Sequence, residues 1–263
     1  MRPILFRIFG LGLPAYGTML VLSFLAAIVL VGRAAKRYRI PSAVVTDLAF
    51  WIMVGVIIGG RVLYVVFHLN EYYDLLSIFE IWRGGMMFFG SFIGAVVAGV
   101  LFVRKTKVPA LLLADLAAPS IALGEFFTRI GCFLNGCCFG YPTNLPWGVV
   151  FPFDSFAGQS AVGGHPLHPT QLYSSFFGLL LFFYLLIRSH YRHLRGEMFA
   201  QYLIISGIYR FGIDFIRYYE NTANLWINQL ISLAVIIAGF WLLFWSRKHK
   251  IEDRAVAPAA AKK

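Results

Sequence analysis

Residues 12–32 read GLPAYGTMLVLSFLAAIVLVG, a stretch without a single charged side chain. About 20 mostly apolar residues in a helix are enough to cross the roughly 30 Å hydrocarbon core of a bilayer. The stretch therefore predicts a transmembrane helix. It is too long for the apolar region of a signal peptide and no small-residue cleavage site follows it, so we expect it to be retained as a membrane anchor.

Six further stretches of similar length and composition follow along the chain. They lie near 46–67, 86–103, 109–131, 170–187, 197–216 and 227–245. Over the whole chain 59% of residues are hydrophobic and 13% are charged, against roughly 25% charged in a soluble domain. Because lipid offers no partner to open backbone groups, such stretches form helices. The sequence predicts an all-α integral membrane protein, a seven-transmembrane helical bundle in a single domain over 1–254.

The 23 Lys and Arg residues alternate from one side of the predicted membrane to the other. Sixteen follow the first, third, fifth and seventh stretches: Arg33, Lys36, Arg37, Arg39, Arg104, Lys105, Lys107, Arg188, Arg192, Arg195, Arg247, Lys248, Lys250, Arg254, Lys262 and Lys263. Four lie on the other side: Arg2, Arg7, Arg83 and Arg217. The positive-inside rule then predicts an outward amino terminus and a cytoplasmic carboxyl terminus. This explains the net charge of +11 without any nucleic acid as partner.

Two connections and the end of the chain complete this topology. The loop 132–168 has Asp154 as its sole charged residue and, with 68–85, is expected to form a small outward-facing head. Long loops in compact proteins are usually functional. Residues 255–263, AVAPAAAKK, are of low complexity and are expected to form a disordered cytoplasmic tail.

Besides Asp47, Asp115 and Glu197 near the cytoplasmic ends, five charged residues fall inside the predicted spans, where each costs about 2.5–3.5 kcal/mol on the insertion scale. They are Arg61, Glu125, Arg129, Arg210 and Asp214. Glu125 and Arg129 are four residues apart, as are Arg210 and Asp214, so each pair lies on one helical face. Intrahelical ion pairs, in which each acid orients its arginine, are therefore one explanation.

Depth along the spans indicates a second explanation. Counted at about 1.5 Å per residue, the three arginines fall in the outer half of the membrane. Tyr16, Asn135 and His168 are expected in the same layer. Planar guanidinium groups suit bidentate binding of phosphate, and a phospholipid headgroup is the phosphate ligand at hand.

The residues around Arg129 resemble a known family. Thr128–Gly140, TRIGCFLNGCCFG, is similar to the most distinctive segment of the prolipoprotein diacylglyceryl transferases. Gly59-Gly60-Arg61, Gly84-Gly85-Met86 with Phe88-Phe89-Gly90, His168–Tyr173 (HPTQLY) and Arg210–Asp214 resemble further motifs of that family, in the same order. With Tyr16-Gly17, the resemblance covers most of the chain.

This resemblance implies a bacterial inner-membrane enzyme. Such an enzyme moves the diacylglyceryl group of phosphatidylglycerol to the lipobox cysteine thiol of a prolipoprotein signal peptide and releases glycerol phosphate, the first step of lipoprotein maturation. Its partners are thus phosphatidylglycerol, prolipoproteins and membrane lipid. Neither cofactor nor metal is expected, and no nucleotide-binding motif occurs in the chain.

The resemblance also implies roles for individual residues. Arg129 and Arg210 would stabilise the departing phosphate. The residues expected to bind phosphatidylglycerol are Arg129, Arg210, Asn135, Gly136, Gly140 and Arg61. For Arg61, which follows Gly59 and Gly60, a structural clamp between closely packed spans is the alternative.

The base that deprotonates the thiol is less well defined by the resemblance. Phe89 stands where some members carry a histidine proposed for that role, and a phenyl ring accepts no proton. Tyr16, His168, Asp214 and water near the phosphate are the remaining candidates. His168 has a suitable ordinary pKa of about 6.5, but its place before Pro169 equally fits a structural role at a helix start.

Three cysteines, Cys132, Cys137 and Cys138, lie at the start of the outward loop, where some members have Asn and Glu at the first two positions. Buried small hydrophobes are the favoured interpretation, with a Cys132–Cys138 disulfide second. A metal site with His165 or His168 is disfavoured because no C-x2-C spacing occurs.

Two other functions would use some of the same features. A transporter or channel would also use intramembrane ion pairs, but it predicts internal repeats and charges near the midplane, and the sequence has neither. A membrane thiol oxidoreductase built on the cysteines would require a C-x-x-C pair, which is absent.

Overall fold

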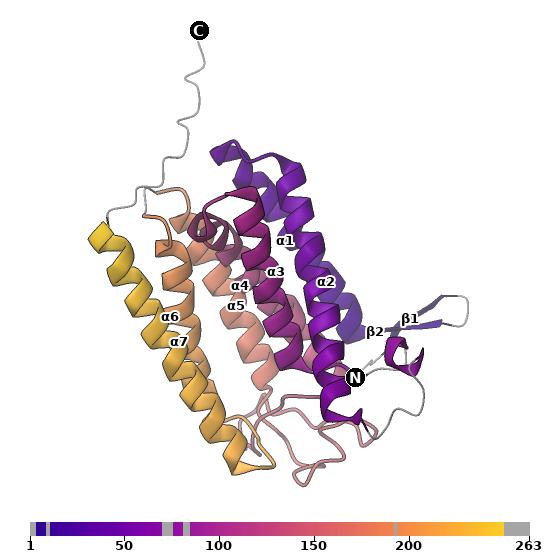
Figure 1. Ribbon diagram of the computed structural model, residues 1–263. Helices are drawn as coiled ribbons and strands as arrows, with labels where there is room; N and C mark the ends of the chain where they lie inside the picture. The colour runs from indigo at the N-terminus through magenta and orange to yellow at the C-terminus, as the bar shows by residue number, and fades with distance from the viewer. Residues whose placement is uncertain (1–3, 9–10, 70–75, 81–84, 192–193, 250–263) are drawn as a thin grey trace. The chain divides into compact units, whose positions relative to one another are not determined.

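The computed structural model describes residues 4–8, 11–69, 76–80, 85–191 and 194–249. Seven α-helices make up most of this part of the chain (Figure 1). They are α1 Ala15–Ala35, α2 Ser42–Phe67, α3 Phe88–Thr106, α4 Ala110–Asn135, α5 Thr170–Arg188, α6 Glu197–Ile213 and α7 Thr222–His249. The shorter elements are the strands β1 Ile4–Ile8 and β2 Leu11–Pro14 and the 3-10 helices η1 Lys36–Tyr38 and η3 Leu76–Phe79.

Each predicted span coincides with one of these helices, and the predicted all-α membrane class is confirmed. Six helices in the described part of the chain are long and apolar enough to cross a bilayer. Helix α6, with 17 residues, is shorter than the other six, so its crossing of the membrane stays a prediction.

One element at the amino terminus departs from the all-α prediction. β1 and β2 pair as an antiparallel hairpin, with Ile4 opposite Pro14. The first helix therefore begins at Ala15, three residues after the predicted start. Proline has no amide hydrogen to donate within a helix, so Pro14 marks the change from strand to helix.

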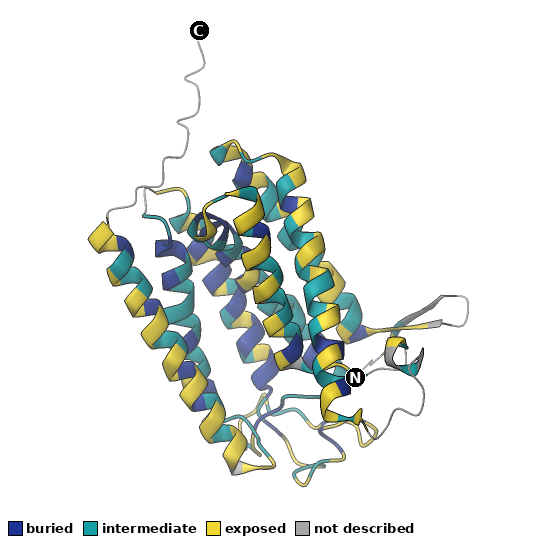
Figure 2. Cartoon of the chain, in the orientation of Figure 1, coloured by how far each residue is buried: buried dark blue, intermediate teal, exposed yellow. Residues whose placement is uncertain are grey.

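Several helices are exposed along much of their length (Figure 2), and many of their exposed residues carry large apolar side chains. Helix α7 exposes Trp226, Leu230, Ile237, Trp241 and Phe244 along its length. A helix of a soluble protein carries polar side chains on its exposed face. An apolar exposed face instead matches a helix whose outer surface meets lipid.

Contacts within the chain define two units, which are described separately. The first comprises residues 1–31 and 114–254. Its core lies where α4, α5 and α6 meet, at Ala118, Ala122, Leu181, Leu185 and Met198. Asp115 of α4 accepts hydrogen bonds from the amides of Gly196 (2.5 Å) and Phe199 (2.8 Å), so a buried carboxylate caps the start of α6.

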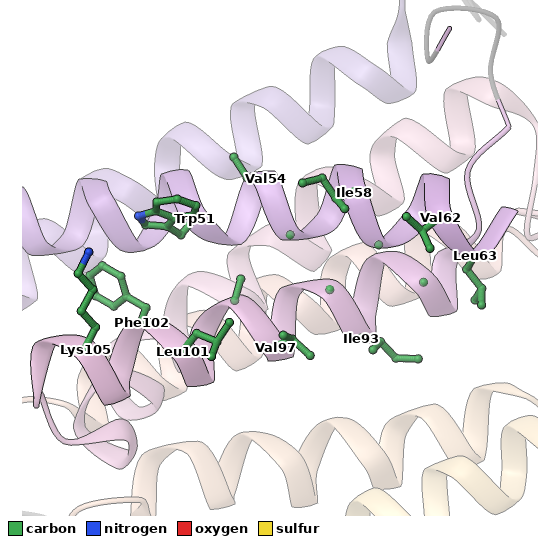
Figure 3. A pocket seen from close by; sticks show the side chains of 15 residues that line it. Trp51, Val54, Ile58, Val62, Leu63, Ile93, Val97, Leu101, Phe102 and Lys105 are labelled. Carbon is green, nitrogen blue, oxygen red and sulfur yellow. The ribbon is translucent and has the colours of Figure 1, made fainter. Parts of the chain in front are cut away.

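The second unit contains residues 32–113, with α2 packed along α3. Their backbones approach at glycines: a Cβ added to Gly59 would meet the carbonyl oxygen of Gly90, and one added to Gly94 would meet that of Gly55. Small residues permit such contact between membrane helices. An apolar groove of about 600 Å³ follows this seam, with Trp51 and Lys105 at the same end of it (Figure 3).

The long connection between α4 and α5 folds against the ends of the helices. Helix α4 continues to Asn135, so the connection spans 136–169 rather than the predicted 132–168. It has its own apolar cluster of Phe139, Phe151, Ala157 and Leu167. The predicted tail 255–263 and residues 70–75 and 81–84 of the predicted loop 68–85 lie outside the described residues.

Candidate active site

Helix α4 carries the first of the two predicted ion pairs. Nη2 of Arg129 lies 3.6 Å from Oε1 of Glu125, one helical turn earlier. The two side chains are 19% and 22% exposed, so both are largely withdrawn from the surface. At 3.6 Å the contact is an ion pair without a short hydrogen bond, and the guanidinium keeps donors for another partner.

Helix α6 carries the second predicted pair, and it is more tightly built. Nη2 of Arg210 lies 3.2 Å from Oδ1 of Asp214 and donates to the hydroxyl of Tyr219 at 3.0 Å. That hydroxyl in turn donates to Oδ1 of Asp214 at 2.8 Å. Asp214 is buried, and its Oδ2 has no hydrogen-bond partner among the described residues. Asp214 and Tyr219 thus fix the direction of the Arg210 guanidinium.

Tyr219 is suited to keep this arrangement at physiological pH. Burial raises its pKa to about 12, and the hydrogen bond to Asp214 acts in the same direction, whereas Arg217 and Arg210 oppose the rise. The hydroxyl therefore stays protonated and continues to donate to Asp214.

A third arginine joins the two that the sequence predicts. The Arg210 guanidinium experiences the positive charges of both Arg217 and Arg129. Arg217 places its guanidinium carbon 5.3 Å from the ring centroid of Tyr219, and its backbone is bridged to Gly140. Sequence reasoning missed Arg217 because it follows the predicted span and was counted only as one of four outward-side cations.

Tyr16 of α1 lies close to the carboxyl end of α4, and its catalytic role stays a prediction. It is the second residue of α1, and a Cβ added to Gly131 of α4 would lie 3.1 Å from its Cα. Its hydroxyl interacts electrostatically with Arg129 and with all three cysteines. Gly131 therefore permits α1 to bring Tyr16 close to the carboxyl end of α4.

The carboxyl end of α4 is closed by a glycine in the left-handed conformation. Gly136 has φ +72°, its amide donates to the carbonyl of Phe133, and the amide of Cys137 donates to that of Cys132. This pair of bonds is the Schellman ending of a helix. Asn135 is the last helical residue.

Gly140 joins three segments and leaves no room for a side chain. An added Cβ would lie 2.6 Å from the carbonyl oxygen of Ile216 and 2.7 Å from Cβ of His168. Its amide donates to the carbonyl of His168 at 2.9 Å. Gly140 thus holds the segment before α5 against the segment after α6.

His168 makes contacts that fit the predicted structural alternative. Its Nδ1 lies 3.3 Å from the hydroxyl of Tyr173, one turn into α5, and that hydroxyl also accepts from Nε1 of Trp147 at 2.7 Å. Pro169 precedes the first residue of the helix. A catalytic role for His168 stays a prediction.

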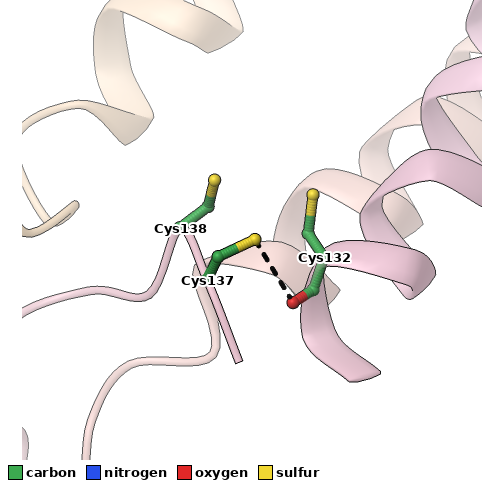
Figure 4. A group of neighbouring side chains, drawn as sticks. All are labelled: Cys132, Cys137 and Cys138. Carbon is green, nitrogen blue, oxygen red and sulfur yellow. Dashed lines mark hydrogen bonds between the residues drawn. The ribbon is translucent and has the colours of Figure 1, made fainter. Parts of the chain in front are cut away.

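The three cysteines are free thiols, and their sulfur atoms lie within 4.8 Å of one another (Figure 4). The predicted Cys132–Cys138 disulfide is therefore not formed in this structure. Cys132 is buried, as the favoured interpretation expects, whereas Cys137 and Cys138 are half-buried. Hydrogen bonds from the other two thiols lower the pKa of Cys138, and the charges of Arg217 and Arg129 act in the same direction.

Two residues at the start of α5 hold the cysteine backbone in place. Oγ1 of Thr170 donates to the carbonyl of Cys138 at 2.8 Å, and Nε2 of Gln171 donates to that of Cys137 at 2.7 Å. Gln171 is buried, and its Oε1 has no partner among the described residues. The family-like HPTQLY block therefore acts partly by positioning the cysteine segment.

Arg61 belongs to the second unit and contacts the connection between α2 and α3, so its predicted role as a clamp between the spans stays a prediction. It is buried and donates to the backbone carbonyls of Gly85 (3.1 Å), Ser77 (2.9 Å) and Glu80 (3.4 Å). The segment between α2 and α3 is thereby tied to α2. A role in binding the phospholipid stays a prediction.

Comparison with known proteins gives independent evidence on the family of this chain. Residues 3–245 match the family model described as prolipoprotein diacylglyceryl transferase. The chain is 37% identical over 252 residues to the phosphatidylglycerol–prolipoprotein diacylglyceryl transferase of Clostridium tetani, covering 95% of this chain and all of that protein. The proteins of the same name in Geobacter sulfurreducens and Pseudoalteromonas atlantica are 34% and 36% identical, with 95% and 97% of this chain covered and 96% and 92% of theirs. The chain belongs to the prolipoprotein diacylglyceryl transferase family.

Proposed function

We propose that this protein transfers the diacylglyceryl group of phosphatidylglycerol to the lipobox cysteine of prolipoproteins, and that Arg129 and Arg210 bind the phosphate. The names of its relatives support the reaction and both substrates. The observation that carries the proposed roles is the arginine group itself. Arg210 experiences the positive charges of both Arg129 and Arg217, and the same two arginines also act on Cys138.

A phosphate relieves the repulsion between these like charges. The diester phosphate of phosphatidylglycerol carries one negative charge, whereas the glycerol phosphate that leaves carries up to two. A fixed positive cluster therefore stabilises the transition state more than the bound substrate, which is the condition for catalysis. Glu125 and Asp214 act as positioning residues, because each is paired with the arginine that it orients.

The chemical step requires no cofactor. The thiolate sulfur attacks the glyceryl carbon that carries the phosphate, a carbon–sulfur bond forms as the carbon–oxygen bond breaks, and the electron pair passes to the phosphate oxygen. The thiol proton must be taken up, because an ordinary thiol with pKa about 8.5 is mostly protonated at neutral pH. Tyr16, His168, Asp214 and water beside the phosphate are the candidate acceptors.

The proposed setting is the bacterial inner membrane, crossed by all seven helices, with α6 included. In this topology the amino terminus and the head formed by 136–169 and 68–85 face outward, and the carboxyl terminus lies in the cytoplasm. The excess of Lys and Arg after α1, α3, α5 and α7 supports this orientation. Residues 1–254 then act as one catalytic domain, with Asn135, Gly136 and Gly140 at the phospholipid site.

The test is transfer of labelled diacylglyceryl from phosphatidylglycerol to a lipobox peptide by the purified protein. Arg129→Ala and Arg210→Ala are each expected to reduce kcat/KM at least about 100-fold, as loss of a preorganised donor to developing charge does. Arg188→Ala is the matched control, since Arg188 also forms an ion pair, 3.1 Å from Glu197, and its side chain is 27% exposed, as is that of Arg210.

Two results would contradict the proposal. Folded wild-type protein that transfers nothing when phosphatidylglycerol is supplied would remove the assignment of the reaction. Thermal unfolding would first establish that all variants are folded. If Arg188→Ala then lost as much kcat/KM as Arg129→Ala, the arginine cluster would have no specific role.

A further inference from the structure

The three thiols form a compact cluster that the transfer reaction, as proposed, does not use. Their sulfur atoms lie within 4.8 Å of one another, and no other group of three His, Cys, Asp or Glu residues in the described ranges is gathered in this way. All three sulfurs come from one short segment, the end of α4 and the turn that follows it (Figure 4).

The backbone holds this arrangement without help from a ligand. The Schellman ending of α4 brings Cys132, the fourth-last residue of the helix, next to Cys137, the second residue after it. Cys138 has φ +61°, which non-glycine residues seldom adopt. Thr170 and Gln171 fix the carbonyls of Cys138 and Cys137. The sulfurs are therefore preorganised.

We propose that Cys132, Cys137 and Cys138 bind a single thiophilic metal ion, Zn²⁺, through three sulfur ligands. Zinc takes thiolates at about 2.3 Å in tetrahedral geometry, which places its sulfurs roughly 3.8 Å apart. None of the present sulfur–sulfur separations exceeds that value by more than about 1 Å. Three protein ligands leave the fourth position for water or a substrate thiol.

The charge of the surroundings fits such a complex. Three thiolates and one Zn²⁺ carry a net charge of −1, which costs free energy in a largely buried site unless cations lie nearby. The guanidinium groups of Arg217 and Arg129 act on Cys138, so compensating charge is already present. The sequence argument against a metal rested on the missing C-x2-C spacing, but the helix ending brings together sulfurs five residues apart.

The experiment uses the full-length protein, reduced and freed of metal in detergent. Titration with Zn²⁺ against a coloured chelator is expected to show one ion bound per chain, and Co²⁺ in its place should give a thiolate-to-cobalt charge-transfer band. Zn²⁺ should also raise the thermal unfolding midpoint, because binding to the folded state alone stabilises it. Cys132→Ser, Cys137→Ser and Cys138→Ser should each weaken binding at least about tenfold.

His165→Ala is the matched control, since His165 is exposed and lies in the same connection. Affinity that falls in His165→Ala but not in the cysteine variants would overturn the proposal in favour of a surface histidine site. If wild-type protein whose three thiols are shown to be free gave no cobalt band, the proposal would be overturned by the wild type alone. A different outcome is a purified protein that holds one free thiol and one disulfide after exposure to air and binds no Zn²⁺ after reduction. That result would show that the cluster serves redox chemistry and would overturn the proposal.

Discussion

At the scale of single residues, the site depends on how the arginines are held. Nη2 of the Arg210 guanidinium contacts two oxygen atoms, Oδ1 of Asp214 and the hydroxyl of Tyr219. Both contacts use this one nitrogen. The planar group retains further donors that can bind phosphate in bidentate fashion. A lysine has a single nitrogen, so it cannot keep both contacts and also bind the phosphate with the same geometry.

Arg210→Lys is therefore expected to lower kcat/KM for diacylglyceryl transfer at least about tenfold although the charge is kept. The measurement is steady-state transfer with phosphatidylglycerol and a lipobox peptide. Arg188→Lys serves as the control, because it replaces an ion-paired arginine in α5 outside the proposed site. Equal activity of Arg210→Lys and wild type would show that positive charge alone suffices there.

Tyr219 supplies a prediction on pH. Its pKa is raised from the ordinary 10 to about 12, so the folded protein holds this proton more tightly than the unfolded chain. The resulting stabilisation is complete below about pH 10 and is lost as the pH rises toward 12. Tyr219→Phe lacks this ionisation, so the stability advantage of wild type over the variant should shrink between about pH 10 and pH 12. The thermal unfolding midpoints of both proteins, measured across this pH range, give this stability advantage. A difference in midpoint that stays constant with pH would contradict the raised pKa of Tyr219.

At the scale of elements, the close approach of α2 and α3 depends on glycines at defined positions. A Cβ at Gly94 would meet the carbonyl oxygen of Gly55, whereas nothing lies within 4 Å of a Cβ at Gly99, five residues later on the same helix. Gly94→Ala is expected to destabilise the protein by about 1–3 kcal/mol through overpacking. Gly99→Ala should be neutral or stabilising by up to about 1 kcal/mol, because alanine is the better helix former.

Thermal or denaturant unfolding of the two variants in the same detergent tests this comparison. Since both changes add one methyl group to α3, helix propensity cancels and packing decides the difference. If the Gly94→Ala variant were as stable as the Gly99→Ala variant, α2 and α3 would not be in backbone contact at Gly94.

The elements themselves could be predicted from sequence far better than their ends. Apolar length located all seven helices, because in lipid a helix is the only way to satisfy the backbone of such a stretch. The end of α4 was predicted at residue 131, where apolar character fades, but the helix continues until Gly136 takes the left-handed conformation. The hairpin of β1 and β2 was missed because short strands beside a long apolar run leave little periodic signal.

At the scale of the whole molecule, the site gathers residues from distant parts of the chain. Spacing predicted the pairs Glu125–Arg129 and Arg210–Asp214, since four residues are one helical turn. It could not predict Arg217 or Tyr219, whose positions depend on the turn after α6 and on the bridge to Gly140. Contacts of that kind arise from tertiary packing, and no local pattern carries them.

Orientation in the membrane supplies the last prediction. The cationic side chains concentrate after α1, α3, α5 and α7, so the connection 136–169 should face outward and the end of α3 should face the cytoplasm. Asp154 and Lys107 are exposed at these two places. In intact cells, a membrane-impermeant maleimide should label Asp154→Cys, whereas Lys107→Cys should react only after the membrane is opened. Wild-type protein, labelled in parallel, gives the contribution of Cys132, Cys137 and Cys138. Labelling of Lys107→Cys from outside, with Asp154→Cys protected, would invert the topology and place the arginine cluster on the side opposite to secreted prolipoproteins.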